Sequence, residues 1–297
     1  TIRPAPQRAS ARGLPNPAMK FHFPAPDGRD PADACIQVDA PSRLHLGFLD
    51  PNASLGRCFA SLGLVIDAFA TRLAVCPARD NAIETDDPRQ HDAVRRLARH
   101  LDTLQRETGR PQPLRVRLRS APPAHSGFGS GTQLALALGR AFCALHGLEL
   151  STRRLAAMLG RGERSGVGIA GFDQGGLLLD GGPGPGGTPA PVLARLDFPA
   201  AWRVLLMLDE RIDGMSGAAE RAAMDQLAPF PRELAADLCH QVLLKVLPAV
   251  IEQRFEPFAE GVSRIQSQIG DYFAPAQGGS MYTSAADTAQ AALDTIT

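Results

Sequence analysis

A short glycine-rich run between an alternating segment and a helical one constrains this chain more than any other feature. Residues 114–119 read Leu-Arg-Val-Arg-Leu-Arg, which predicts a strand with one apolar face. Residues 126–131 read Ser-Gly-Phe-Gly-Ser-Gly. Leu134, Leu138 and Phe142 then recur on one stripe of a predicted helix. A strand, a tight loop and a helix in this order bring backbone N–H groups and the positive end of a helix to one place, where an anion can bind.

The loop from His125 to Thr132 is therefore a candidate phosphate-binding loop. A glycine-rich turn that only packs a helix on a sheet explains the same residues. Three known loop templates fit poorly: the Walker A loop needs a lysine, Thr132 stands where GxGxxG ends, and Phe128 replaces the first glycine of GxSxG. The candidate binding residues are Ser126, Gly127, Gly129, Ser130, Gly131 and Thr132.

A second glycine-dense segment, residues 160–176, connects a predicted helix to a predicted strand. Its glycines would let the backbone approach a ligand, and Arg161 and Arg164 supply forked donors suited to phosphate. Asp173 is a candidate base or ligand of a divalent metal, whereas Glu163 stands between the arginines and can simply pair with them. The alternative is structural: Asp173 caps a turn and the arginines are solvated.

A third candidate is the polar cluster Pro-Ser-Arg-Leu-His-Leu-Gly at residues 41–47, which ends the first predicted strand and contains Arg43 and His45. A lone histidine is more often packed and hydrogen-bonded than catalytic, so His45 gains weight only from its neighbours. Other histidines, including His91, His100 and His240, show no metal-ligand spacing and are assigned no role.

The overall charge disfavours a nucleic-acid partner. The 297 residues contain 31 Lys+Arg and 31 Asp+Glu, for a formal net charge of +0. A basic nucleic-acid binder is therefore not expected. Lys20 and Lys245 are the only lysines of the sequence, so few residues could form a Schiff base with a substrate.

The cysteines and the apolar runs indicate a soluble protein of the cytoplasm. The five cysteines are odd in number and contain no CxxC pair, which argues against a disulfide framework and favours a reducing compartment. No apolar run approaches the roughly 18 residues of a membrane span. The opening residues lack the apolar core of a secretory signal and are expected to be a mobile tail.

Hydrophobic periodicity predicts strands early and helices late, and so an α+β fold of two lobes. The further strands are expected at 35–41, 61–69, 71–76, 175–180 and 203–208. The further helices are expected at 88–106, 152–159, 216–227, 231–247 and 256–269. The predicted organisation is a tail over 1–34, an N-terminal lobe with the phosphate loop over 35–190, and a C-terminal lobe over 191–297.

Taken together, these segments resemble the GHMP kinase superfamily, named for its galactose, homoserine, mevalonate and phosphomevalonate kinases. The stretch from Pro123 to Gly131 resembles its phosphate loop, PxxxGLGSS. Three further parts of the sequence are more similar to one branch of this superfamily. They are residues 40–47, residues 160–176, and the pair of segments Leu-Pro-Ala-Val from Leu247 and Tyr-Phe-Ala-Pro-Ala-Gln-Gly-Gly from Tyr272. That branch is the β-ribofuranosylaminobenzene 5'-phosphate synthases of methanopterin biosynthesis.

Departures from the kinase pattern favour the synthase branch. Many of the kinases carry SGxD with a catalytic aspartate, and Gly168 stands in the place of that aspartate here. A hydrogen atom cannot act as a base or a metal ligand, so kinase chemistry is disfavoured and Asp173 is the expected carboxylate. Gly131 replaces the second serine of the loop. The segment GQSSWGPT, which the family usually carries near its C-terminus, is missing from the sequence. Either a shortened chain or an incomplete site would account for this.

The resemblance implies a GHMP-kinase-like fold with an N-terminal ribosomal-protein-S5-like lobe and a helix-rich C-terminal α+β lobe. It implies a decarboxylating pentosyltransferase that joins phosphoribosyl pyrophosphate to 4-aminobenzoate or 4-hydroxybenzoate, with Mg2+, as a homodimer. The loop would bind pyrophosphate or the 5'-phosphate, with Arg161, Arg164 and Ser165 as further binding residues. Asp173 would stabilise the ribosyl cation or hold Mg2+, and Arg43 and His45 would line the catalytic wall.

Three other functions are consistent with the sequence. An ATP-dependent small-molecule kinase of the same superfamily would consume ATP and release no CO2. A relative that binds its ligand without catalysis would bind phosphoribosyl pyrophosphate and not turn it over. An RNA-binding role for the ribosomal-protein-S5-like lobe is weakened by the neutral charge and by the scarcity of Trp and Tyr.

Overall fold

The computed structural model describes residues 18–22, 35–123, 126–206, 208, 222–223 and 226–277. His125, most of the expected tail over 1–34, most of the helix expected at 216–227 and the last residues of the motif that begins at Tyr272 lie outside this range.

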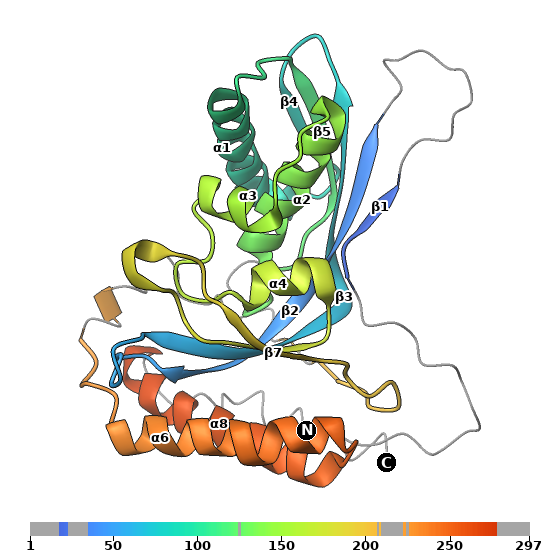
Figure 1. Ribbon diagram of the computed structural model, residues 1–297. Coiled ribbons are helices and arrows are strands. Elements are labelled where there is room, and N and C mark those ends of the chain that lie inside the picture. The colour runs from blue at the N-terminus through green and yellow to red at the C-terminus, as the bar shows by residue number, and fades with distance from the viewer. Residues whose placement is uncertain are drawn as a thin grey trace.

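A long antiparallel pair, β2 (Ile36–Asp50) and β3 (Phe59–Pro77), forms the centre of the sheet (Figure 1). The strand order is β1-β2-β3-β5-β4, with β6 paired to β3 and β7 paired to β6. The two strands expected at 61–69 and 71–76 are one strand, because β3 pairs with β6 at its start and with β5 at its end. The other strands are β1 (Lys20–His22), β4 (Ala82–Thr85), β5 (Leu114–Ser120), β6 (Leu177–Asp180) and β7 (Val192–Leu196).

A first hydrophobic core joins one end of this sheet to its helices. Leu97, Leu101 and Leu104 are the buried stripe of α1 (His91–Thr108), which follows the short helix η2 (Pro88–Gln90). The predicted stripe of the next helix is also buried, in α2 (Ser130–His146). In β5, buried residues alternate with exposed arginines as predicted. The helices α3 (Thr152–Met158) and α4 (Val167–Gln174) complete this layer.

A second core lies at the other end of β2 and β3, where Trp202 and Phe258 pack together with ring centroids 5.0 Å apart. Figure 1 shows the two helical groups at opposite ends of the long strands, which confirms the two-lobed α+β fold. The helices of this lobe are α6 (Arg232–Gln241), η4 (Val242–Val246), α7 (Leu247–Ile251), α8 (Phe255–Phe273) and η5 (Ala274–Gln277). The turn η3 (Pro185–Gly187) lies before β7.

The segments α6, η4 and α7 form one continuous helix, Arg232–Ile251, which is long and apolar enough to cross a membrane by length and composition. One face packs into the second core through Leu238, Val242 and Val246. Its opposite side leaves Leu243 and Leu244 exposed. Packing against α8 and the sheet accounts for the buried face.

Three expectations about the secondary structure are wrong. Residues 203–206 form no strand, and β7 supplies the edge of the sheet instead. The segment expected as a glycine-rich connection contains a helix, α4. Within the expected tail, β1 pairs with β2. In addition, β7 follows the boundary expected at residue 190 and yet pairs with β6, so the sheet continues across that point.

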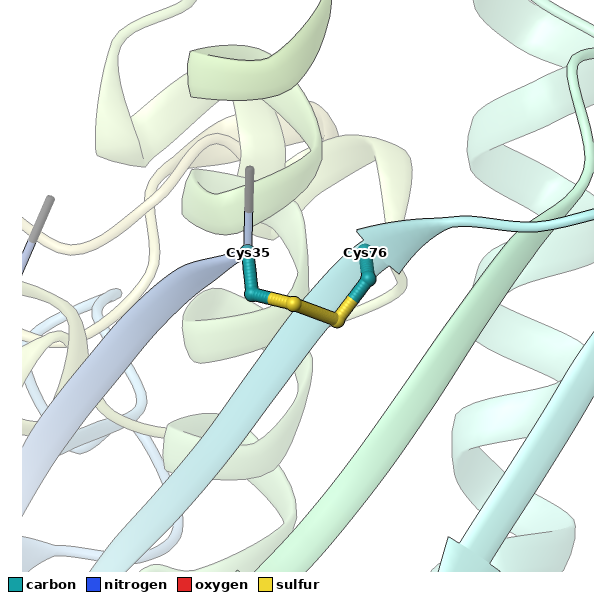
Figure 2. The surroundings of a disulfide bond; sticks show 2 residues. All are labelled: Cys35 and Cys76. Atoms are coloured by element: carbon teal, nitrogen blue, oxygen red, sulfur yellow. A yellow bond between two sulfur atoms is a disulfide. The ribbon is translucent and has the colours of Figure 1, made fainter. Parts of the chain in front are cut away.

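The argument against disulfides is also wrong, because Cys35 and Cys76 are joined (Figure 2). Ile36 pairs with Val75 across β2 and β3, and the next pair outward brings the two cysteine Cα atoms to 4.3 Å. They are 41 residues apart in sequence, so only the strand register reveals their proximity. The cysteines therefore no longer support a reducing compartment.

Candidate active site

The glycine-rich loop is attached to the free side of β2. The backbone N–H of Arg43 donates to the carbonyl of Phe128 at 3.1 Å, and that of His45 donates to the carbonyl of Gly127 at 3.3 Å. On its other side the same stretch of β2 pairs with β3. The loop is thereby fixed on the sheet next to the polar cluster at 41–47, so two of the three candidate segments lie together.

The N-terminus of α2 is open. Gly127 and Gly129 have φ angles of 75° and 68°, a left-handed conformation that glycine adopts without strain. Gly129 is the N-cap residue, and no side chain of the described residues caps the helix there. The first-turn N–H groups of a helix have no partner within the helix, and the helix dipole adds partial positive charge. This end of α2 is therefore suited to bind an anion.

The two glycine-dense segments meet at this helix terminus. Gln133 Nε2 donates to the carbonyl of Gly168 at 3.0 Å. A Cβ atom on Gly168 would lie 3.4 Å from Thr132 Cγ2, and one on Gly131 would lie 3.1 Å from Arg161 Nη1. The glycine at 131, where the kinase loop has serine, thus allows a guanidinium to approach the first turn of α2.

Arg43 and His45 stand beside the loop with buried polar atoms. Arg43 Nη1 donates to the carbonyl of Gly127 at 3.3 Å, whereas its Nε is buried and has no partner among the described residues. Burial lowers the pKa of Arg43 to about 10, and the charge of Asp180 partly opposes this shift. Arg43 therefore keeps its charge at neutral pH.

His45 is held neutral. Burial and the charge of Arg43 lower the pKa of His45 to about 3. The ring packs on Phe48 with centroids 4.3 Å apart, and neither ring nitrogen has a hydrogen-bond partner within the described part of the chain. A neutral imidazole can donate from one nitrogen and accept at the other, so His45 offers both functions to a ligand.

Sequence reasoning missed Asp180, a fully buried carboxylate at the end of β6. It accepts hydrogen bonds from Ser61 N (3.2 Å), Ser61 Oγ (2.6 Å), Ser165 Oγ (3.1 Å), Gly166 N (2.8 Å), Val167 N (3.2 Å) and Gly182 N (2.8 Å). These donors satisfy the buried charge and cap the start of α4. The only sequence signal was an acidic residue that closes an apolar run of three leucines.

Ser165 is engaged in the same network. Its hydroxyl donates to Asp180 and lies 2.7 Å from Ser61 Oγ, and it accepts the N–H of Val167 at 3.2 Å. Arg164, the residue before it, is half-buried. Ser165 therefore helps to hold the second glycine-dense segment against the sheet.

Comparison with known proteins identifies the family. The profile described as GHMP kinases N terminal domain matches residues 93–181. The Beta-ribofuranosylphenol 5'-phosphate synthase of Archaeoglobus fulgidus is 35% identical over 246 residues, which cover 78% of this chain and 75% of that protein. The protein of the same name from Methanothermobacter thermautotrophicus is 31% identical over 252 residues, which cover 77% and 74%. The chain belongs to the beta-ribofuranosylphenol 5'-phosphate synthase family. It is an enzyme, and the predicted family is confirmed.

Solved structures confirm the fold of this family member. Phosphomevalonate kinase of Streptococcus pneumoniae superposes with a TM-score of 0.52 at 13% identity, covering 80% of each chain. A mevalonate diphosphate decarboxylase of Legionella pneumophila gives a TM-score of 0.53 at 14% identity, covering 81% of this chain and 78% of the other. The synthase-family chain thus has the GHMP kinase fold that the motifs predict.

The structure does not bring Asp173 of this enzyme to the phosphate loop. Thr152 Oγ1 donates to Asp173 at 2.8 Å, and Arg140 Nη2 lies 3.8 Å from it. Arg140 is ten residues beyond Ser130 along α2, which is about 15 Å of helix. Helix α4, which the sequence did not predict, carries Asp173 to this distant end. The role expected for Asp173 as a base or Mg2+ ligand therefore has no geometric support.

The described residues of this family member do not fit a Mg2+ ion held by the protein alone. Among them, no group of three or more His, Cys, Asp or Glu could hold a metal. The oxygens of Asp180 are occupied by six donors, and Asp173 is paired with Arg140 and Thr152.

Proposed function

We propose that the chain catalyses the decarboxylating C-ribosylation of a 4-substituted benzoate by phosphoribosyl pyrophosphate. The C1–O bond to pyrophosphate breaks and pyrophosphate keeps the electron pair. The ring carbon that bears the carboxylate then attacks C1. Loss of CO2 returns the electrons of the broken C–C bond to the ring and restores aromaticity, so the products are a C-riboside 5'-phosphate, CO2 and pyrophosphate.

One observation carries this proposal: guanidinium groups from two separate segments flank the open N-terminus of α2. Arg161 lies by Gly131, and Arg43 lies by Gly129, where a Cβ atom would be 3.0 Å from its Cγ. Cationic groups and backbone N–H donors around a departing pyrophosphate stabilise the negative charge that develops on it. The donor has phosphate groups at both ends, and this arrangement suits such a substrate.

The replacement of the kinase aspartate by Gly168 fits the same chemistry. Gly168 packs against Thr132 next to the loop. A carboxylate there would repel a substrate with several negative charges and would have no alcohol to deprotonate in this reaction. Asp180, the buried carboxylate nearby, is fully hydrogen-bonded to serine hydroxyls and backbone N–H groups and holds these segments in place.

For the aromatic substrate we propose 4-hydroxybenzoate. The relatives are named as synthases of beta-ribofuranosylphenol 5'-phosphate, and a phenol is what 4-hydroxybenzoate leaves after decarboxylation. 4-Aminobenzoate would give the aniline instead. We assign Arg164 to the binding of phosphate or of the benzoate carboxylate. Arg43 and neutral His45 form the wall next to the reacting carbons.

The proposal includes Mg2+, a homodimer and the cytoplasm as its setting. Mg2+ usually keeps waters and binds through substrate phosphates with few protein ligands, so the ion would enter chelated to the pyrophosphate of the donor. The metal dependence of turnover, the mass in solution and the location in cells test these three parts of the proposal.

The decisive experiment is a release assay with the whole chain. The protein is incubated with Mg2+, phosphoribosyl pyrophosphate and benzoate labelled in its carboxyl group, with 4-hydroxybenzoate and 4-aminobenzoate in parallel. We expect one CO2 for each pyrophosphate, faster with 4-hydroxybenzoate. ATP consumption without CO2 would identify a kinase, and donor binding without turnover would identify a binding protein.

A further inference from the structure

A polar face of α1 borders the first turn of α2. Arg96, Arg99 and His100 lie on this face, next to the buried leucine stripe. A Cβ atom on Gly131 would lie 3.5 Å from Arg96 Nη1 and 3.1 Å from Arg161 Nη1. Two guanidiniums from distant parts of the sequence therefore reach the same glycine at the open end of a helix.

The positive charges in this cluster act on one another. Burial lowers the pKa of Arg161, Glu163 opposes the shift, and Arg96 and Arg99 lower it further. His100 shows the same field: burial first, and then Arg161, Arg99 and Arg96, lower its pKa to about 4. Like charges gathered at a helix N-terminus are unfavourable in the empty protein and become favourable when an anion binds.

The carboxylates in reach do not neutralise the cluster. Asp92 pairs with Arg96 at 2.7 Å, but Arg96 Nε is buried and has no partner within the described part of the chain. Among the described residues, no carboxylate lies within ion-pair distance of Arg99 or Arg161. Farther along α1, Arg106 pairs with both Asp102 and Glu107, as surface arginines commonly do.

We propose that Arg96, Arg99 and Arg161 form, with the first turn of α2, the subsite for the pyrophosphate group of the ribosyl donor. This inference rests on the proposed function. Three guanidinium groups and a helix N-terminus match the higher charge of pyrophosphate better than that of a single phosphate. They would stabilise the leaving group as its charge grows. The 5'-phosphate would then bind elsewhere in the site.

The test measures binding of inorganic pyrophosphate and of ribose 5-phosphate to the whole chain by calorimetry. The variants are Arg96→Gln and Arg99→Gln. The matched control is Arg95→Gln on the same helix, whose arginine is exposed and pairs only weakly with Asp92 at 3.4 Å. We expect pyrophosphate binding to weaken about tenfold or more in each variant, because a charge-assisted hydrogen bond is lost. Binding of ribose 5-phosphate, and both ligands in the control, should change less than about twofold.

Each outcome decides the question. Unchanged pyrophosphate binding in both variants overturns the subsite, even if the wild type releases CO2. Equal weakening of both ligands overturns the assignment to pyrophosphate. Weaker binding of pyrophosphate alone in the variants supports the subsite. The release assay tests the overall function separately, since a protein could bind pyrophosphate here and release no CO2.

A measurement on the wild type covers the case in which a variant fails to fold. The charges that lower the pKa of His100 are those of Arg161, Arg99 and Arg96. The nearby carboxylates act on these arginines: Asp92 pairs with Arg96, and Glu163 opposes the pKa shift of Arg161. Bound pyrophosphate would offset the guanidinium charges and raise the pKa of His100. NMR measures this pKa from the imidazole signal of His100, which the His100→Gln variant identifies. A rise of about one unit is expected. No rise at saturating pyrophosphate would overturn the subsite.

Discussion

The carboxylate of Asp180 accepts the hydroxyl hydrogen of Ser61 at 2.6 Å, although 119 residues separate the two in the chain. The same carboxylate accepts the N–H groups of Gly166 and Val167 at the start of α4. This one side chain therefore joins β3, β6 and the second glycine-dense segment. The position of the segment that carries Arg161 depends on it.

Asp180→Asn should destabilise the protein by about 3 kcal/mol or more. An amide would place an N–H group against N–H donors, and a buried polar group without a partner costs about 1–3 kcal/mol for each lost bond. Urea unfolding measures the loss. Asp102→Asn, an exposed residue that pairs with Arg106, is the control and should change stability by about 0.5 kcal/mol or less. Equal effects at the two positions would contradict this role for Asp180.

Gly168→Asp should weaken pyrophosphate binding without unfolding the chain. A Cβ atom at Gly168 would meet Thr132 at an ordinary contact distance of 3.4 Å, so the first atom of a side chain makes no clash there. The added negative charge next to the loop would repel the ligand. Gly168→Asn has the same size without the charge, and we expect it to bind about tenfold more tightly than the aspartate variant at low salt.

The salt dependence of binding tests whether charge causes the difference between the Gly168→Asp and Gly168→Asn variants. Ionic screening shortens the reach of a charge to about 8 Å at physiological ionic strength. The gap between the aspartate and asparagine variants should therefore narrow as salt rises. A gap that does not depend on salt would point to a steric effect at Gly168.

The helices and strands that the sequence predicts correctly are those in which apolar side chains repeat at short, regular intervals. The leucine stripe of α1, the alternation of β5 and the apolar stripe of α2 all lie where periodicity predicts them. Their side chains repeat at short intervals, and burial follows the repeat. The phosphate loop was predictable for the same reason, because its glycines lie between two such elements.

The rest depends on contacts between distant residues. Helix α4 is rich in glycine because the backbone must pack closely: a Cβ atom on Gly171 would lie 2.6 Å from Val65 Cγ2. Glycine disfavours a helix locally, so propensity predicted a loop. The partners of Asp180 and the approach of Arg96 to Gly131 also arise only in the folded chain. No local pattern could reveal them.

The Cys35–Cys76 disulfide should be measurable as missing thiols. Unfolded protein prepared without reductant should show three reactive thiols, those of Cys58, Cys143 and Cys239. Reduction should lower stability by about 3–4 kcal/mol, because the bond closes a loop of 41 residues in the unfolded chain. Cys35→Ser should reproduce the loss, whereas Cys239→Ser, at an exposed position, should not. Five reactive thiols would contradict the bond.

Acid should destabilise the protein through His45. Its pKa is about 3 in the folded chain against 6.5 in the unfolded chain, so the unfolded state binds more protons between these values. Stability is then full above pH 6.5 and falls as the pH drops toward 3. Between pH 6.5 and 5 the part of this loss that comes from His45 should be about 2 kcal/mol, and His100, whose pKa is also lowered, to about 4, adds to the total. Urea unfolding at both pH values should show a smaller loss for His45→Gln and an unchanged one for His240→Gln, at an exposed position.

The Asp173→Asn variant distinguishes the catalytic role that the sequence predicts for Asp173 from the structural role that its contacts indicate. If Asp173 acts in catalysis, turnover should fall by orders of magnitude. Its observed partners are Arg140, about 15 Å along α2 from Ser130, and Thr152 at the start of α3, so we expect kcat to change by less than about threefold. Stability should fall by about 1 kcal/mol, since the bond to Thr152 weakens. Thr152→Val should cause a similar loss of stability. A collapse of kcat in Asp173→Asn with normal stability would return Asp173 to the active site.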